Sequence, residues 1–221
     1  MGHRTFYISA LRAVSASIVG SEKATTPPTH ATGATGSTVV IPVPAGVVSG
    51  DLLLAAIIGG GNTPPAGWSL ISGDASVGLY SRTAGGSEPA TYTWTLSSGG
   101  QSRSGCMIAL RNGVLGDFSS NFAQALQPSA TAGATAGGIY VGFYVQAFGV
   151  ATGDSISATS PGLVMQTQHD ALGSAPYSYR VNTGISARTG LGSSEVCNAE
   201  DMVHPDGDDA STRFSAIYDN T

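Results

Sequence analysis

Residues 90–97 read ATYTWTLS, and this octapeptide decides the fold class. Its large apolar side chains, Tyr92, Trp94 and Leu96, alternate with threonines. A period of two is typical of a β-strand that buries one face, because successive side chains of a strand point to opposite sides. We therefore predict a half-buried strand here. Cys106, Ile108 and Leu110 repeat the alternation and predict a second half-buried strand at 106–110.

Short segments of similar character lie on both sides of this strand. Between them stand turn residues such as the Pro44-Ala45-Gly46 triplet and the proline-rich loop 62–67, and no segment carries a sustained helical stripe. Many short strands with glycine and proline between them favour an all-β, jelly-roll-like antiparallel β-sandwich. The predicted strands cover residues 38–43, 51–58, 68–71, 77–82, 90–97, 106–110, 139–148, 163–168, 177–181 and 213–218.

The first thirty residues differ from the rest, so we predict an extended N-terminal arm at 1–30 and a β-sandwich domain at 31–221. Arg12 interrupts the apolar stretch that a secretory signal needs, so we expect the arm to be retained. Phe6, Ile8 and Leu11 are the candidate partner-binding residues of this arm. The arm either docks on a neighbouring subunit or folds loosely on its own domain.

Composition limits the partners. Charged residues make up 10% of the chain, against about 25% in ordinary soluble domains, and the net charge is −5. A protein that binds nucleic acid usually carries a basic footprint, and a membrane helix needs a long apolar run. We therefore expect neither nucleic acid nor membrane as a partner. Low charge is consistent with extensive subunit contact, because interface cores are depleted in charge.

The residues of a catalytic site are not grouped in this sequence. The block 153–156 superficially resembles the nucleophile block of the GDSL esterases, but it lies late in the chain and between predicted strands, so Ser155 is expected to sit in a turn. No pair of histidines has the spacing that grips a metal ion. We predict that the protein is not an enzyme and needs no cofactor. The four histidines are His3, His30, His169 and His204.

Cys106 and Cys197 are the two cysteines of the chain, and ninety-one positions separate them. They have no zinc-ligand spacing. The sequence leaves open whether they form a disulfide or remain two inert thiols.

The acidic residues gather in one place, since six of the fourteen fall within residues 195–209. Asp206, Asp208 and Asp209 are weak candidates for a calcium site, because hard cations prefer oxygen ligands. The same stretch equally fits an acidic patch that faces basic residues of a partner, or a solvated loop.

Tyr177 and Tyr179, beside Pro176 and Arg180, are candidate glycan-binding residues. Exposed aromatic rings of this kind stack on sugars in many β-sandwich lectins. Most of the other aromatic residues have strand spacing and are expected in the core.

Four motifs follow one another in residues 44–113: PAGVVSGDLLLAAI, TPPAGWSLI, LYSRTAGGSEPATYTWTL and MIALRNG. In order and spacing they resemble a domain that is common in bacteriophage virion proteins and in some bacterial surface proteins. Each motif also has a local role. We expect positive-φ turns at Gly46 and Gly50, and bonds from Asp51 to backbone amides. Gly67 should reverse the chain so that Trp68 enters the core with its indole N–H at the polar rim.

The resemblance implies a structural protein of the virion. Its expected role is that of a capsid decoration or cement protein, and its expected partners are major capsid or tail subunits. We expect a homo-oligomer, with a trimer favoured. The alternative is a carbohydrate-binding adhesin of a phage tail or fibre, or of a bacterial cell surface.

Overall fold

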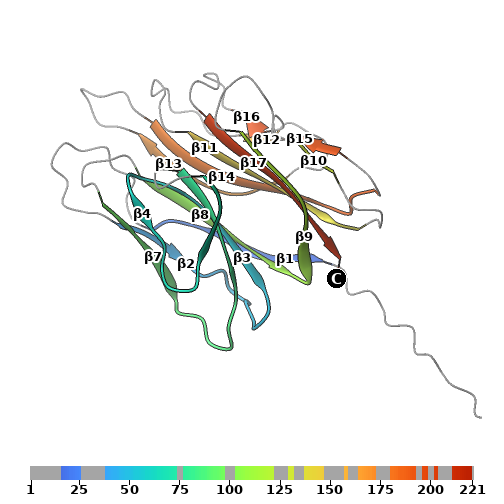
Figure 1. Cartoon of the computed structure of the whole chain (residues 1–221), viewed down its shortest axis with the longest axis horizontal. Helices are drawn as coiled ribbons and strands as arrows, with labels where there is room; N and C mark the ends of the chain where they lie inside the picture. The colour runs from blue at the N-terminus through green and yellow to red at the C-terminus, as the bar shows by residue number, and fades with distance from the viewer. Residues whose placement is uncertain are drawn as a thin grey trace, which may run out of the picture.

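A computed structural model of the chain describes residues 16–25, 38–73, 77–97, 103–121, 129–131, 137–146, 157–158, 164–172, 180–192, 196–198, 202–203 and 211–220. Within these residues the regular structure consists of β-strands, with no helix, and every strand pair is antiparallel (Figure 1). The predicted all-β fold is confirmed. The jelly-roll connectivity stays a prediction, because several connecting segments lie outside the described residues.

Three sheets build the body of the molecule. The central sheet has the order β1 (Ser17–Lys23), β8 (Ser104–Arg111), β3 (Leu52–Ile58), β6 (Val77–Thr83) and β5 (Ser69–Gly73). The C-terminal sheet has the order β13 (Val164–Leu172), β14 (Arg180–Thr189), β11 (Ile139–Gln146), β17 (Ser211–Asn220) and β9 (Gly113–Asn121). The small sheet consists of β2 (Thr38–Pro42), β7 (Thr91–Leu96) and β4 (Asn62–Thr63).

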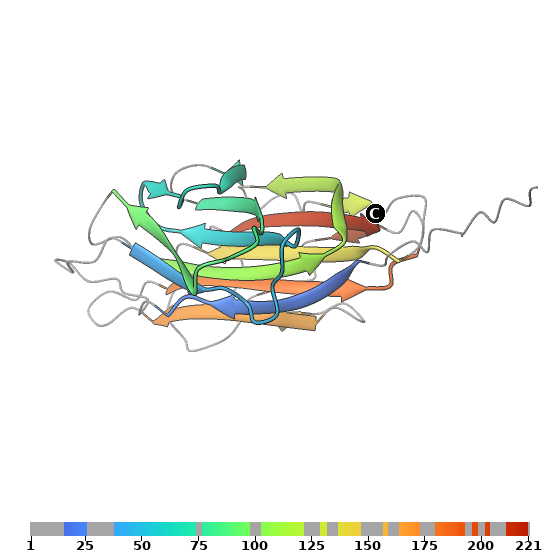
Figure 2. The same ribbon diagram turned by 90° about the horizontal axis from the view of Figure 1, so that it is seen from below.

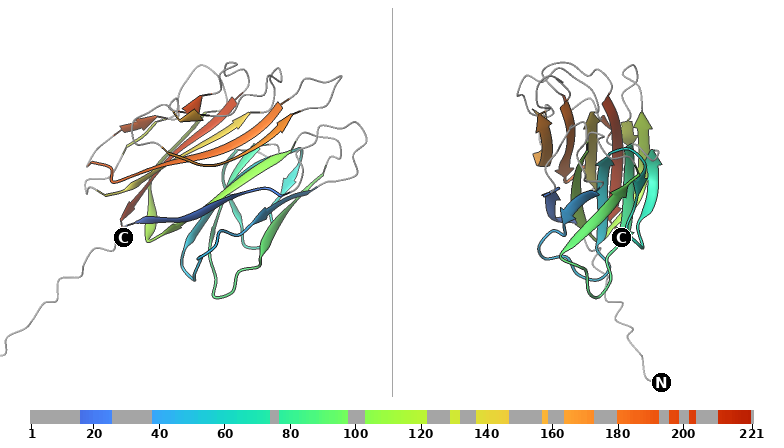
Figure 3. Two further views of the ribbon diagram at one scale, coloured as in Figure 1. Left: turned by 180° about the vertical axis from the view of Figure 1, so that it is seen from behind. Right: turned by 90° about the vertical axis from the view of Figure 1, so that its left-hand side faces the viewer.

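Two further strand pairs are short. β10 (Ser129–Thr131) pairs with β15 (Val196–Asn198), and β12 (Ser157–Ala158) pairs with β16 (Met202–Val203). The strands of the central and C-terminal sheets run broadly along the long axis of the molecule (Figure 2). Seen from behind, the C-terminal sheet forms one layer, and the central and small sheets lie together on its other side (Figure 3).

The central sheet is buried on both faces, and β3 shows this most clearly. Alternate residues of its LLLAAII sequence enter two different cores. Leu54 belongs to the core shared with the C-terminal sheet, where it joins Val141 and Phe143. Leu53 belongs to the core shared with the small sheet, where it joins Trp94. A strand that is covered on both sides has no polar face, which explains the uninterrupted apolar run.

The burial predicted for β7 is confirmed, and the burial predicted for the segment 106–110 is wrong. β7 alternates strictly between exposed threonines and buried Tyr92, Trp94 and Leu96. In β8, residues 104–110 are all buried, because one sheet covers each face. Gly105 faces the small sheet, where an added Cβ would lie 2.9 Å from side-chain atoms of Val39 and Ile41. Only glycine fits there without displacing its neighbours.

β1 lies within residues 1–30, where the sequence predicted an arm. It pairs with β8 at the edge of the central sheet. Directly after it, the backbone N–H of Ala24 donates to Gly105 O at 2.9 Å, and that of Thr25 donates to Val40 O at 2.9 Å. Residues 16–25 therefore link the central sheet to the small sheet.

The turn predictions for the motif region are confirmed, with one exception. Gly46, Gly50 and Gly67 have φ values of 86°, 93° and 83°, in the region that favours glycine. Trp68 is buried as expected, but its indole N–H is not at a polar rim: it is buried with no hydrogen-bond partner among the described residues. The ring packs edge-on against Tyr92, with 5.2 Å between centroids, and this contact draws it inward.

Candidate partner-binding surface

The chain passes from the central sheet to the C-terminal sheet at one corner. β8 ends at Arg111, and β9 begins at Gly113. Between them Asn112 has φ 57°, a left-handed conformation that asparagine tolerates better than most residues. Ser17 at the start of β1 pairs with Arg111, and Asn220 at the end of β17 pairs with Gly113. Both described ends of the chain therefore lie at this corner (Figure 1).

A bidentate ion pair fixes the corner. Arg111 donates from Nε to Asp51 Oδ1 and from Nη2 to Asp51 Oδ2, each at 2.9 Å, and from Nη2 to Gly46 O at 2.8 Å. Asp51 Oδ2 also accepts the N–H of Val48 at 2.8 Å, so the predicted amide bonding of Asp51 is confirmed. The loop 43–51 is thereby fastened to β8.

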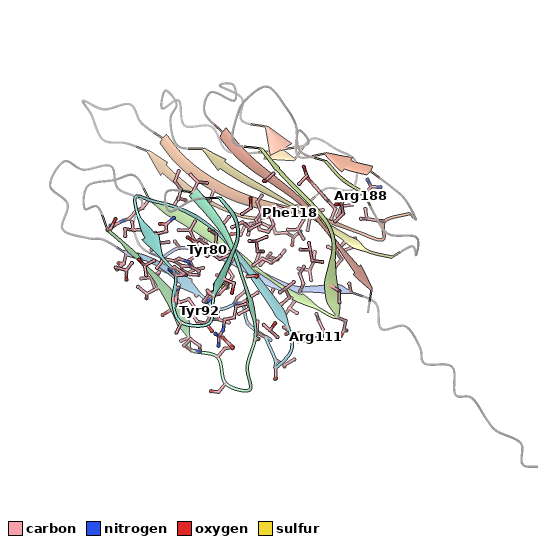
Figure 4. The ribbon with its side chains drawn as sticks, viewed as in Figure 1. Tyr80, Tyr92, Arg111, Phe118 and Arg188 are labelled. Atoms are coloured by element: carbon pink, nitrogen blue, oxygen red, sulfur yellow. The ribbon has the colours of Figure 1, made fainter. Side chains whose placement is uncertain are left out.

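The hydrogen bonds from Arg111 lower the pKa of Asp51 despite its burial. The partner effect is reciprocal, since Asp51 raises the pKa of Arg111. Asp51 is therefore held as a carboxylate by a contact that serves the fold. Figure 4 labels Arg111 in this part of the molecule.

Apolar side chains are exposed on both segments that flank Arg111. Val48, in the loop that Asp51 holds, is 52% exposed, while Val114 and Leu115, at the start of β9, are 54% and 44% exposed. We call these three residues the corner surface. The other large apolar side chains exposed in the described residues are Leu70 on β5 and Val164 on β13. We take the corner surface as the candidate partner-binding surface, because apolar groups exposed together are a feature of protein interaction sites.

A second ionic cluster lies on the side of the small sheet and is internal. Glu88 Oε1 accepts the N–H of Gly85 at 2.6 Å and lies 3.5 Å from Arg82 Nη2, and Glu88 Oε2 accepts the hydroxyl of Tyr92. Arg82 also lies over the Tyr92 ring, 5.5 Å from its centroid, and donates to Ala66 O. The cluster thus joins two motif loops to β6 and β7.

The contacts in this cluster shift the pKa values of Glu88 and Tyr92. Burial raises the pKa of Glu88, but the hydrogen bonds from Tyr92, Gly85 and Arg82 outweigh burial and bring it below its usual value. Burial, and then the bond to Glu88, raise the pKa of Tyr92 to about 12. Glu88 is therefore ionised and Tyr92 is neutral at ordinary pH.

A third polar group is sealed between the central and C-terminal sheets. Ser104 Oγ and Thr183 Oγ1 are 2.7 Å apart, and Cys106 Sγ lies 3.3 Å from the same Thr183 Oγ1. All three residues are fully buried. Cys106 is a free thiol, so it is not bridged to Cys197. These hydroxyl and thiol groups are buried, so a substrate in solution cannot reach them. The contacts between them join the central sheet to the C-terminal sheet.

Most of the site residues predicted from the sequence lie outside the described residues and stay predictions. His169 falls on the backbone of β13, and the structure does not describe its side chain. The others are Phe6, Ile8 and Leu11 of the arm, Tyr177 and Tyr179, Asp206, Asp208 and Asp209, and Ser155.

Two searches of the described part of the chain gave no candidate. Nowhere in it do three or more His, Cys, Asp or Glu residues gather where they could hold a metal ion. It also contains no helix long and apolar enough to cross a membrane.

Comparison with known proteins adds no relative. No family model matches the chain, and no curated protein or solved structure matches it. The class defined so far is an all-β sandwich with a third, smaller sheet. The resemblance to virion domains therefore rests on the four sequence motifs alone.

The sequence reasoning missed the corner surface. The sequence feature that could have indicated this surface is the run Asn112-Gly113-Val114-Leu115-Gly116, in which two adjacent apolar residues stand between glycines. In a regular strand one of two neighbours faces the core and the other faces out. Here both are exposed, next to the irregular pairing that leaves Gly116 without a partner in the register of β9 and β17.

Proposed function

We propose that this chain is a structural protein of a bacteriophage particle, most simply a capsid decoration protein that stabilises the particle through subunit contacts. Its partners are then other virion proteins and further copies of itself, with a trimer favoured. No chemistry is required of it. The rival proposal is a glycan-binding adhesin of a tail, fibre or cell surface.

The observation that carries the proposal is the corner surface. Val114 and Leu115 stand exposed at the start of β9, three and four positions after Arg111, whose bonds to Asp51 fasten the loop 43–51 to the end of β8. A preorganised apolar surface loses little conformational entropy on binding, which favours lasting contacts. The ionisable groups with shifted pKa values, among them Asp51 and Glu88, are engaged by backbone and side-chain contacts of the fold.

The motif residues support the same proposal. Gly46, Gly50 and Asp51 form one motif and Arg111 ends another, and the structure joins the two motifs through hydrogen bonds. The first and last motifs thus meet at the corner, while the second and third meet in the cluster of Arg82 and Glu88. A scaffold that holds a binding surface suits a cement protein better than an enzyme.

Immunogold electron microscopy tests the proposal. Antibody raised against the purified chain would be applied to phage particles from the source culture. We expect label distributed over the capsid. In a matched binding assay, the purified chain and a Val114→Ser, Leu115→Ser double variant would each be added to stripped particles. The double variant should bind at least tenfold more weakly.

Other labelling patterns decide between the alternatives. Label confined to the tail tip, with loss of cell attachment after Tyr177→Ala and Tyr179→Ala, would support the adhesin. Particles that carry no copy of the chain would refute both virion proposals. Catalytic turnover of a small ester that disappears in Ser155→Ala would refute the absence of enzymatic activity.

A further inference from the structure

Within the part of the chain that the structure describes, β9 is an edge strand. It is the last strand of the C-terminal sheet and pairs on one side with β17; no described strand pairs with its other side. The pairing is irregular between Ile217 and Tyr218, which leaves Gly116 without a partner in the register. The outer side of an edge strand carries backbone N–H and C=O groups that another strand can bond, and the part of β9 that matters here is residues 113–116. Val114 and Leu115 add exposed apolar side chains to both faces of that edge.

The chain enters the described body beside this edge. Ala16 is buried in the core between the two larger sheets, and Ser17 pairs with Arg111, two positions before β9. Residues 1–15 therefore join the body at the corner. Fifteen residues can span roughly 50 Å when extended, so they can reach a neighbouring copy.

Residues 1–15 also have the right chemistry for this edge. They include Phe6, Ile8 and Leu11, with Phe6 and Ile8 at the alternate spacing that places both on one face of a strand. Their charged residues are Arg4 and Arg12, with no Asp or Glu. The remaining residues hold seven Lys and Arg against all fourteen acidic residues. The segment is thus basic and the body is acidic, which favours contact between copies.

We infer that residues 1–15 of a second copy add to the outer edge of β9, with Phe6 and Ile8 on the face that carries Leu115. Strand addition of this kind takes affinity from backbone hydrogen bonds and specificity from alternate side chains. Each copy carries both the segment and the edge at one corner, so copies can exchange segments. The inference rests on the proposed function and names its contact.

Disulfide trapping tests the contact directly. Full-length Ile8→Cys and Leu115→Cys proteins, each in a Cys197→Ser background and each with a different tag, would be mixed and oxidised. We expect the mixed disulfide to form at least tenfold faster than with Val164→Cys in place of Leu115→Cys. Val164 is the matched control, because it is 58% exposed on β13, the opposite edge of the same sheet. Equal rates would overturn the inference.

The double variant with Ile8→Cys and Leu115→Cys in one chain shows whether the segment binds β9 of its own chain or β9 of another copy. A disulfide that forms within a single chain at high dilution, and no mixed disulfide, would show that the segment covers its own β9 and would overturn exchange.

Sedimentation separates this inference from the proposed function. We expect deletion of residues 1–15, Leu115→Asp and the combination of both to weaken self-association by the same factor of at least ten, because all three remove one contact. Unchanged association in the deletion and in Leu115→Asp would refute strand addition and leave a structural role standing. Particles without the chain would refute the structural role even if exchange occurs.

Discussion

The two faces of the central sheet have opposite chemistry. Toward the C-terminal sheet the core consists mainly of aliphatic side chains around Phe143, with the Ser104–Thr183 hydrogen bond inside it. Toward the small sheet the core contains the rings of Trp68, Tyr80, Tyr92 and Trp94 and is bordered by the Arg82–Glu88 pair. The face toward the C-terminal sheet is therefore stabilised by close packing of aliphatic side chains. The face toward the small sheet is stabilised by a few large rings beside an ion pair.

The largest effects are expected from the large rings at the centre of each of the two cores. Trp94 is fully buried, and Trp94→Ala should lower the free energy of unfolding by about 3–5 kcal/mol. Phe143→Ala, on the other face, should cost about the same. Urea unfolding followed by circular dichroism measures both. A single transition in each variant would show that the faces unfold together, and a loss under about 1 kcal/mol for either would contradict its place in the core.

Glu88→Gln should cost about 1.5–3 kcal/mol, because it weakens charge-assisted hydrogen bonds to Tyr92, Arg82 and Gly85. Tyr92→Phe removes one of these bonds and is the matched control, with an expected loss of about 1 kcal/mol. Thermal unfolding at pH 7 compares them. A larger loss in Tyr92→Phe than in Glu88→Gln would show that the carboxylate does not organise the cluster.

Ser104→Ala and Thr183→Val should each cost about 1–2 kcal/mol, because each leaves a buried polar atom without its bond across the sheets. The double variant should cost less than the sum of the two, since it removes both partners. Denaturant titration of the four proteins gives the coupling free energy. Strict additivity would mean that this hydrogen bond does not join the sheets.

The pH dependence of stability should be the smallest effect, because it comes from the lowered pKa values of two carboxyl groups. The pKa values of Asp51 and Glu88 are lowered in the fold, so their stabilisation is fully present above their unfolded values and is lost as the pH falls through the folded ones. Melting temperature from pH 2 to 7 measures this loss. Asp51→Asn and Glu88→Gln should each flatten the curve, and an unchanged slope in both would contradict the assignment.

Tyr92 acts at the other end of the pH scale. Its pKa is raised to about 12, so its stabilisation is present below the unfolded value near 10 and is lost as the pH rises from there towards 12. Absorbance at 295 nm during alkaline titration follows tyrosine ionisation. Tyr92→Phe should remove an ionising step near pH 12, and removal of a step near pH 10 would refute the burial of this hydroxyl.

The fold class could be predicted from the sequence where local rules are strong. Strict alternation identified β7, and glycines and prolines marked the turns at Gly46, Gly50 and Gly67. The same rules failed for β8, because its burial depends on two sheets formed by distant parts of the chain. They also placed the end of β14 too early, at residue 181, since the strand continues through Gly184 only because β11 and β13 pair with it on both sides.

The candidate surface was beyond sequence reasoning for a similar physical reason. Asp51 was predicted to bond backbone amides, but its ion pair with Arg111 joins residues sixty positions apart. Val114 and Leu115 are exposed beside the irregular pairing of β9 with β17, a distant part of the chain. Such features arise from packing between sheets, and no local pattern records them.

The described residues begin at Ala16 and end at Asn220. These two ends lie close together, because Ser17 pairs with Arg111 and Asn220 pairs with Gly113, two positions further along the chain. A reporter domain joined before the first or after the last of these residues would be carried on the same side of the molecule. The tip that holds the Gly59–Gly61 turn would remain free for labelling or immobilisation.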